Sequence, residues 1–213
     1  MTTPTTLPEA FFARDVRVVA RDLLGCRITH AGVTVRLTEV EAYAGGSDPG
    51  SHAFRGRSPR TDVMFGTAGR LYVYFTYGMH FCANVVAGHE GRAAAVLLRA
   101  GEVVAGEDLA EQRRPGVRPR DRARGPARLA TTLGLSREHN GLSLVGSRAA
   151  GRVEPPLAPV DPALVRTGPR VGVSGAGGDG VAYPWRFWLD GDPTVSAYRA
   201  ARPPRTATRS GRA

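Results

Sequence analysis

Two glutamates at alternate positions of one segment are the first candidates for chemistry. Glu39 and Glu41 lie within residues 33–43, whose alternating pattern predicts a strand with both carboxylates on one face. The same face begins with Val35 and Leu37, so both carboxylates are expected near the core. Because a buried carboxylate is costly unless it is paired, one of them either forms an ion pair with an arginine or takes part in acid–base chemistry.

Two further groups follow these carboxylates in the sequence. Tyr43 continues the same strand face, and His52 lies in the next segment, residues 44–69, which is rich in Gly, Ser, Pro and Arg. Long ordered loops are commonly functional. A histidine in such a loop is also commonly an ordinary surface residue, and both interpretations of His52 stay open.

Aromatic side chains are concentrated in one predicted β-hairpin. Residues 71–76 and 79–86 are apolar runs separated by Tyr77 and Gly78. The aromatic residues of this hairpin are Tyr72, Tyr74, Phe75, Tyr77 and Phe81. Most are expected to pack on the sheet, whereas Tyr77 belongs to the turn. It either folds back on the sheet or is exposed, where it would act as a wedge between stacked bases.

The composition excludes several other chemistries. All 29 residues counted as lysine or arginine are arginine, so no lysine is available for a Schiff base or a phosphate loop. The histidines show no metal-binding spacing, and no metal or organic cofactor is expected. The stretch SGAGGDG (174–180) fits no phosphate-loop pattern and is interpreted as a flexible loop. Cys26 and Cys82 are too far apart for a paired motif and are predicted to be buried thiols.

The candidate residues must be positioned by elements that do not alternate regularly. The predicted helices cover 15–24, 104–114 and 126–133, and the predicted strands cover 33–43, 71–76, 79–86, 93–99, 142–145, 170–173 and 185–189. This order favours the α+β class. We expect a single mixed domain with a curved, mostly antiparallel β-sheet, surrounding helices and a protruding β-hairpin.

The positive charge is concentrated in two segments. Of a net charge of +10 in 213 residues, 113–128 carries seven arginines against one aspartate, and 196–213 carries five arginines and no acid. We expect a domain over 1–196 with a mobile basic loop at about 113–125, followed by a disordered basic tail over 197–213. Such arms suit a polyanion such as nucleic acid, or they are simply solvated.

The location of the protein is predicted from two absences in the sequence. The longest apolar run, 93–98, is too short to cross a bilayer, and the N-terminus lacks a cationic start followed by an apolar stretch. We therefore expect a cytoplasmic protein that does not associate with membranes. A monomer is the plainer expectation for its oligomeric state.

Six blocks along the chain form an ordered set of motifs. They are LTEVEAYAG (37–45) with His52, MFGTAGRLYVYFTYGMHFCANVV (64–86), AVLLRA (95–100), GPARLA (125–130), RVGVSGAG (170–177) and WRFWL (185–189). In this order the blocks resemble the alkyladenine, or 3-methyladenine, DNA glycosylases. The resemblance implies an enzyme that binds duplex DNA, flips an alkylated or deaminated purine into a pocket and hydrolyses its N-glycosidic bond. The abasic site left behind would enter base-excision repair. The implied lesions are 3-methyladenine, 7-methylguanine, hypoxanthine and ethenoadenine.

The resemblance also implies a role for each matching residue. Glu41 matches the catalytic glutamate that activates water, Arg99 matches the arginine that helps to hold this water, and the valine backbone of the RVGV segment lies near it in the family. Three residues match those that enclose the flipped base in the family: Tyr43, His52 and Tyr74. Asn84 matches the asparagine that obstructs the 2-amino group of guanine, and Tyr77 the tyrosine inserted into the duplex. The candidates for contact with the DNA backbone are Met79 and Arg128.

Two other function classes stay open on the residues alone. A silent protein that binds damaged DNA or RNA would use the same arginines and aromatic rings without needing Glu41. A carbohydrate hydrolase would use Glu39 and Glu41 as an acid–base pair, although neighbours on one strand face do not flank a sugar from opposite sides. If the chain is a glycosylase, the absence of lysine predicts a monofunctional enzyme with no lyase activity.

Overall fold

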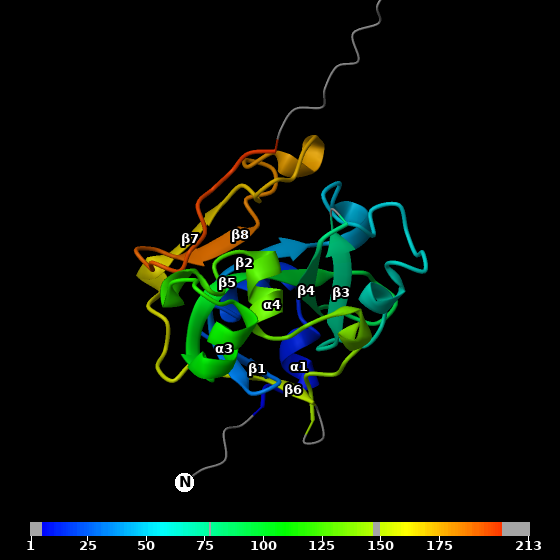
Figure 1. Ribbon diagram of the computed structural model, residues 1–213. Coiled ribbons are helices and arrows are strands. Elements are labelled where there is room, and N and C mark those ends of the chain that lie inside the picture. The colour runs from blue at the N-terminus through cyan, green and yellow to red at the C-terminus, as the bar shows by residue number, and fades with distance from the viewer. Residues whose placement is uncertain (1–5, 77, 147–149, 202–213) are drawn as a thin grey trace, which may run out of the picture.

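Eight antiparallel strands form one open sheet in this computed structural model (Figure 1). The structure describes residues 6–76, 78–146 and 150–201. The strands are β1 (Arg27–His30), β2 (Val33–Tyr43), β3 (Leu71–Thr76), β4 (His80–Val86), β5 (Ala95–Ala105), β6 (Gly151–Glu154), β7 (Val165–Gly168) and β8 (Arg186–Leu189). Their order is β3-β4-β5-β2-β1-β6, with β8 paired to β2 and β7 paired to β8. The predicted α+β class and mostly antiparallel sheet are confirmed.

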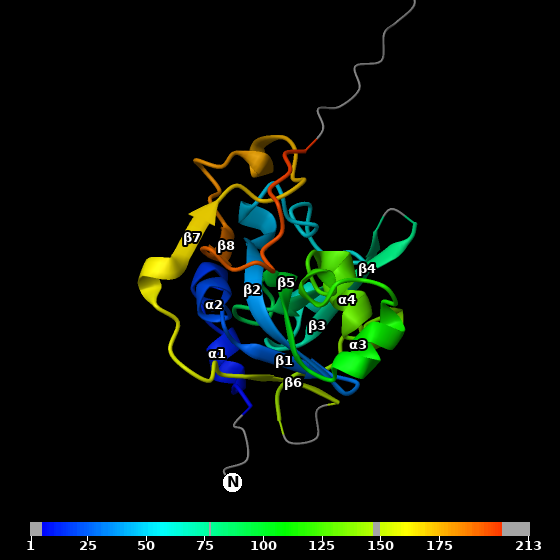
Figure 2. The same ribbon diagram turned by 60° about the vertical axis from the view of Figure 1, so that its left-hand side comes forward.

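Short helices cover the sheet. The α-helices are α1 (Glu9–Phe12), α2 (Val16–Asp22), α3 (Glu107–Arg113) and α4 (Pro126–Thr132), and the 3-10 helices are η1 (Gly45–Ser47), η2 (Asp62–Phe65), η3 (Pro119–Asp121), η4 (Arg137–His139), η5 (Pro162–Leu164) and η6 (Ala176–Gly178). In Figure 2, α1 and α2 lie to one side of β2 and β5, and α3 and α4 lie to the other. The end of the β3–β4 hairpin projects beyond the body in the same view. None of the described helices is long and apolar enough to span a membrane.

Strand β2 follows its predicted range of 33–43 and carries both candidate glutamates. Its first residues alternate between buried and half-buried, whereas every residue from Leu37 to Ala42 is buried. In this part β2 is a central strand, paired with β5 on one edge and, over Glu39–Glu41, with β8 on the other. Its register against β5 shifts on either side of Glu39. Such bulges bend a strand and redirect a side chain.

Two predicted strands are wrong. Residues 142–145 form one bridge, between Ser143 and Arg70, instead of a strand. Residues 170–173 form a turn in which Gly172 has a φ of 72°, a left-handed conformation that interrupts a strand. The strand in this region is β7, which ends directly before Pro169 because proline cannot donate a ladder hydrogen bond.

Other elements differ in length or were not predicted. Strand β5 continues to Ala105, beyond the predicted 93–99, and α3 begins at Glu107 after the left-handed Gly106. Helix α2 lies within the predicted 15–24, and the Asp15 side chain accepts a hydrogen bond from the Arg17 amide as its N-cap. Strands β1 and β6 have four residues each, too few for alternation to show in a sequence.

The apolar core lies between the sheet and the helices and extends to the site of the glutamates. Its fully buried residues include Val19, Ile28, Leu37, Leu98 and Leu129, from α2, β1, β2, β5 and α4. Cys26 and Cys82 are free and buried, as predicted.

Leu98 provides a test of this packing. It has no exposed surface and lies opposite Val40 in the pairing of β5 with β2. Leu98→Ala should lower the free energy of unfolding by about 2–5 kcal/mol through lost burial and the cavity that remains. Urea unfolding measures this change. Val104→Ala on the same strand, at a residue that is 43% exposed, is the matched control and should change stability much less. Equal effects of the two substitutions would contradict this core.

Candidate active site

A pocket of about 610 Å³ gathers most of the predicted site residues. It lies where β2, β3, β4 and β5 meet the first turn of α4 and the segment 171–174. The predicted residues that line it are Glu41, Tyr43, His52, Tyr74, Asn84, Arg99 and Arg128. Met79 is 70% exposed and is not part of the lining. Tyr77 lies outside the described residues.

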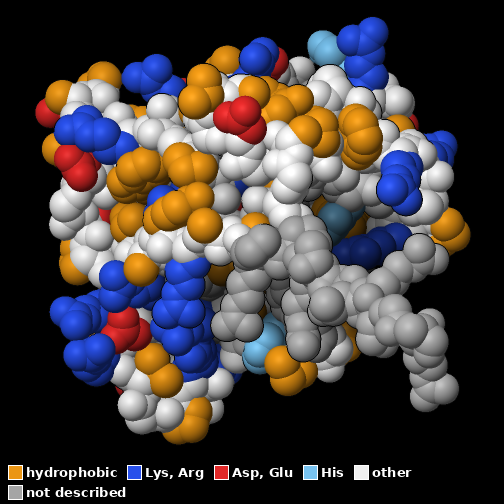
Figure 3. Space-filling model, turned by 90° about the horizontal axis from the view of Figure 1, so that it is seen from above, with side chains coloured by type: hydrophobic (Ala, Val, Ile, Leu, Met, Phe, Trp, Pro, Cys, Tyr) orange, Lys and Arg blue, Asp and Glu red, His pale blue; other side chains and the backbone are white. Residues whose placement is uncertain are grey.

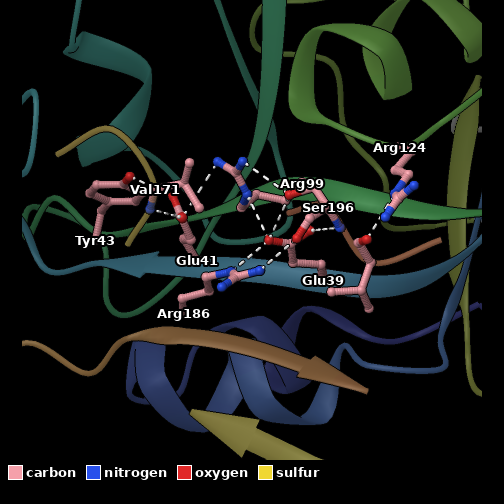
Figure 4. Close-up of polar contacts among 9 residues, drawn as sticks. Glu39, Glu41, Tyr43, Arg99, Arg124, Val171, Arg186 and Ser196 are labelled. Atoms are coloured by element: carbon pink, nitrogen blue, oxygen red, sulfur yellow. Dashed lines mark hydrogen bonds and ion pairs between the residues drawn. The ribbon is translucent and has the colours of Figure 1, made fainter. Parts of the chain in front are cut away.

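The Glu41 carboxylate is the buried chemical centre of this pocket. The Tyr43 hydroxyl donates to Oε2 at 2.8 Å, and the Val171 amide donates to Oε1 at 2.7 Å. Arg99 Nη1 lies 3.4 Å from Oε1. Figure 4 shows these three groups converging on the carboxylate from different segments. Since each carboxylate oxygen offers about two acceptor positions, Oε2, which accepts only from Tyr43 among the described residues, has one position for a further donor.

Tyr43 is held in its protonated form. Burial, and then the negative charge of Glu41, raises the pKa of Tyr43 well above its ordinary value. The hydroxyl therefore acts as a donor to Glu41 at neutral pH. The Arg170 guanidinium lies over the Tyr43 ring, with its central carbon 4.5 Å from the ring centroid.

Arg99 lies between the two glutamates of β2. Its Nε donates to Glu39 Oε1 at 3.0 Å while Nη1 contacts Glu41. Burial alone would lower the pKa of Arg99, but the charges of Glu41 and Glu39 raise it above its ordinary value. The guanidinium is thus a permanent positive charge beside Glu41. Glu39, by contrast, does not line the pocket.

Aromatic rings form one wall of the pocket. Tyr72 and Tyr74 are stacked with centroids 5.6 Å apart, and the His52 ring lies edge-on to Tyr74 at 4.5 Å. His52 Nδ1 and the Tyr72 hydroxyl share a hydrogen bond of 3.1 Å. Asn84 is buried on β4, where its amide nitrogen donates to the Tyr72 carbonyl at 3.0 Å. The wall is therefore a hydrogen-bonded group of aromatic rings against which a planar ring can pack.

His52 is neutral in this wall. Burial of one side of the ring, and then the charge of Arg60, lowers the pKa of His52 to about 4. Arg60 Nη2 lies 3.3 Å from Nε2 and can only donate, so Nε2 is the acceptor and Nδ1 carries the proton. The imidazole thus adds no positive charge to the pocket at neutral pH.

A buried ion pair holds the segment that carries Val171. Arg170 and Asp48 have fully buried side chains and form two contacts, of 2.6 and 2.7 Å. Arg170 also donates to the carbonyls of Ala42 and Gly177. A Cβ on Gly177 would collide with the backbone of Gly50. The stretch SGAGGDG begins three residues after Val171. Because Gly177 in this stretch has no side chain, η6 can pack closely on the loop after β2.

The basic segment 113–128 is largely turned inward. The arginines of this segment whose side chains donate to backbone carbonyls are Arg113, Arg114, Arg122 and Arg124. Arg118 and Arg120 have exposed side chains, at 71% and 53%, and both contact Asp121. Figure 3 views the molecule from the end where β2 finishes, and blue side chains outnumber red ones on that face. Arg128, exposed on α4, adds positive charge at the pocket.

Several residues of the site have no signal in the sequence. Arg186 and Ser196 contact Glu39 from segments more than 140 positions away, and Arg170 lies where a strand was predicted. The predicted cluster of hairpin aromatics included Tyr72, but its place in the pocket depends on the direction in which the side chain points. Arginines that neutralise buried carboxylates could have been expected in general terms but not identified.

The fold and the site together define a class of protein. A pocket lined by a buried carboxylate, a guanidinium and aromatic rings can hold a water molecule and pack against a planar base, which are the two requirements of a hydrolase of N-glycosyl bonds. The family model of methylpurine-DNA glycosylase (MPG) matches residues 10–193, and the chain belongs to this family. The predicted membership is confirmed.

Relatives of similar length share about half of their residues with this chain. A protein of Streptomyces avermitilis is 54% identical over 96% of this chain and 97% of its own length. Proteins of Frankia casuarinae and Leifsonia xyli are 49% and 50% identical over 92% and 90% of this chain, and over 94% and 91% of their own lengths. All three are named "Putative 3-methyladenine DNA glycosylase".

The buried Arg170–Asp48 pair gives a prediction about stability. Arg170→Met leaves the Asp48 carboxylate buried without its partner and should lower the free energy of unfolding by about 3–5 kcal/mol. Chemical denaturation measures the loss. Arg166→Met is the matched control because its pair with Asp190 is about half exposed, and it should cost at most about 1 kcal/mol. A similar small loss for both variants would contradict the role given to Arg170.

The lowered pKa of His52 gives a prediction about pH. The unfolded chain would take up a proton at His52 near pH 6.5, whereas the folded protein would do so only near pH 4. The contribution of this group to stability is therefore fully present above pH 6.5 and falls as the pH drops from there to about 4. NMR titration of the imidazole should show a midpoint near pH 4, with His52→Gln identifying the signal. A midpoint near 6.5 would show that the ring is not desolvated.

Proposed function

We propose that the protein removes alkylated or deaminated purines from duplex DNA by hydrolysing their N-glycosidic bonds. Membership of the methylpurine-DNA glycosylase family supports this function. The observation that carries it is Glu41, the one carboxylate among the described pocket residues, fixed by Tyr43 and Val171 beside Arg99. The abasic site left in the DNA would then enter base-excision repair.

The proposed reaction uses the free acceptor position of Glu41. A water bound at Oε2 would lose its proton to the carboxylate as its oxygen forms a bond to the anomeric carbon of the deoxyribose. The base leaves with the electron pair of the glycosidic bond. The transition state resembles an oxocarbenium ion, which the negative charge of Glu41 stabilises. Arg99 would fix the carboxylate and help to hold the water.

The aromatic wall is the proposed binding surface for the flipped base. Flipping costs a few kcal/mol of lost stacking and pairing, part of which contacts with Tyr43, His52 and Tyr74 would restore. A methylated purine that carries a positive charge gains a further cation–π attraction of about 0.5–2 kcal/mol. Because His52 is neutral, it does not repel such a base. Asn84 is the proposed obstacle to the 2-amino group of guanine.

The lesions are proposed to differ in rate. Cationic bases such as 3-methyladenine and 7-methylguanine leave readily, whereas neutral hypoxanthine and ethenoadenine need a proton as they depart. The described lining of the pocket offers Glu41 as its single carboxyl group, and this group is assigned to the water. We therefore expect cationic lesions to be released faster than neutral ones.

The absence of lysine supports a monofunctional enzyme. Cleavage of the DNA backbone by a glycosylase needs an amine nucleophile, and the chain contains no lysine side chain to supply one. We propose that a monomer acts on duplex DNA in the cytoplasm. Met79 and Arg128 would contact the DNA backbone, and Tyr77 would fill the gap left by the base. The remaining basic segments, at about 113–125 and 197–213, would add electrostatic attraction to the DNA.

The two competing functions are less well supported by the geometry. A carbohydrate hydrolase would need Glu39 as a second working carboxylate, but Glu39 accepts contacts from Arg99, Arg186 and Ser196 and lies behind the pocket. A silent damage-binding protein would need no carboxylate held by donors on both oxygens. Activity assays separate all three functions.

Glu41→Gln tests the proposed reaction. Duplexes with a single 3-methyladenine or hypoxanthine are incubated with wild type or Glu41→Gln in the presence of EDTA, and free base and strand breaks are measured. The wild type should release base, with breaks appearing only after alkali. The variant should lose at least about 100-fold in rate, because the group that takes the proton is gone. If both the wild type and the variant bound the lesion duplex and neither released free base, the protein would be a damage sensor. Strand breaks without alkali would contradict a monofunctional enzyme.

A further inference from the structure

A buried network behind the pocket connects the C-terminal segment to the arginine of the active site. Ser196 lies beyond the end of β8, and its amide donates to Glu39 Oε2 at 2.8 Å. Its hydroxyl donates to Glu39 Oε1 at 3.0 Å and accepts from Arg99 Nη2 at 3.3 Å. Figure 4 shows Glu39, Arg99 and Ser196 together beside Glu41. One serine hydroxyl thus bridges both members of a buried ion pair.

Glu39 is the centre of this network. Its side chain is fully buried and accepts Arg99 Nε at 3.0 Å and Arg186 Nε at 2.6 Å, in addition to the two donors of Ser196. Both of its oxygens are therefore occupied by groups of the protein. Because Glu39 does not line the pocket, its charge serves these neighbours and not a bound base.

The segment that carries Ser196 is itself fixed by other residues. Arg124 Nε donates to the Val195 carbonyl at 2.9 Å, and Arg186 Nη2 donates to the Ser196 carbonyl at 2.9 Å. The Thr194 hydroxyl, almost fully buried, shares a hydrogen bond of 2.8 Å with Thr38 on β2. These contacts place the hydroxyl of Ser196 at one defined point beside Arg99.

We infer that Ser196, acting with Glu39, is a positioning residue that sets the orientation of the Arg99 guanidinium toward Glu41. The inference rests on the function proposed above. Each nitrogen of this guanidinium has a different partner: Nε contacts Glu39, Nη2 contacts Ser196 and Nη1 contacts Glu41. Two of these contacts fix the plane of the group, and the third then directs Nη1 at Oε1. Without the serine hydroxyl, the plane can turn about the bond to Nε, and the contact with Glu41 loosens.

Ser196→Ala tests the inference because it removes the hydroxyl and keeps the amide contact with Glu39. We expect single-turnover excision of 3-methyladenine to slow about tenfold while the affinity for lesion DNA stays unchanged, because misplacement beside the reacting atoms affects rate more than binding. Ser196→Thr keeps the hydroxyl and should restore most of the rate. Ser136→Ala is the matched control: its hydroxyl also contacts a carboxylate, Glu138 at 2.8 Å, but its partners are Glu138 and His139 in place of Glu39 and Arg99, so its rate should equal that of the wild type.

A double variant separates positioning from a general structural effect. If Ser196 acts through Arg99, adding Ser196→Ala to Arg99→Gln should slow excision no further than Arg99→Gln alone. If the double variant instead showed the product of the two single-variant losses in excision rate, the inference would be contradicted. A wild-type rate in Ser196→Ala would contradict it too, as would a loss of DNA affinity or melting temperature in place of rate. A wild type that releases no base would instead reject the proposed function.

Discussion

The position of the Glu41 carboxylate depends on a group of buried charges that neutralise one another. Glu39, Glu41, Arg99 and Arg186 are all buried, and their formal charges sum to zero. Desolvation of such ions is expensive and is offset only where each group has several well-placed partners. This condition explains why β2, β5 and β8 must be neighbours: β2 supplies the acids, and the strands on its two edges supply one arginine each. The bulge at Glu39 then lets β2 present both acids to this group.

The same requirement changes what the high content of arginine means. Counted along the sequence, residues 113–128 look like a cationic arm, yet four of their seven arginines donate to carbonyls within the protein. Arg124 even holds Val195, the residue before Ser196. Net charge is thus a poor guide to the charge available for a polyanion, because a guanidinium that serves a carbonyl has lost part of its capacity for phosphate. The arginines left for DNA are those such as Arg128, which is exposed at the pocket.

The sequence predicted the local elements well and the long-range ones poorly. Strand β2, the hairpin and helix α4 were predicted because alternation, a turn and a proline at the start of a helix are signals within a few residues. The pocket residues were found through the family resemblance of motifs on β2, the hairpin, β5 and α4 and of His52 in the loop after β2. Ser196, Arg186 and Asp48 were missed because their roles depend on where distant segments meet. The prediction of a strand at 170–173 was wrong for the same reason. The apolar pattern of this segment suits a strand, but Arg170 forms an ion pair with the distant Asp48, and Gly172 has a left-handed backbone conformation that makes a turn.

Arginine, and not lysine, suits every cation of this site. Arg99 contacts Glu39, Ser196 and Glu41. Arg186 contacts the Glu39 carboxylate and the Ser196 carbonyl. Arg170 contacts the Asp48 carboxylate and two carbonyls, and it lies over the ring of Tyr43. Such arrangements need several donors in one rigid plane and a charge that is not lost on burial. A lysine has a single nitrogen, and burial readily removes its proton. The absence of lysine therefore does not weaken this candidate site, and it agrees with the proposed monofunctional reaction, because no lysine amine is present for backbone cleavage.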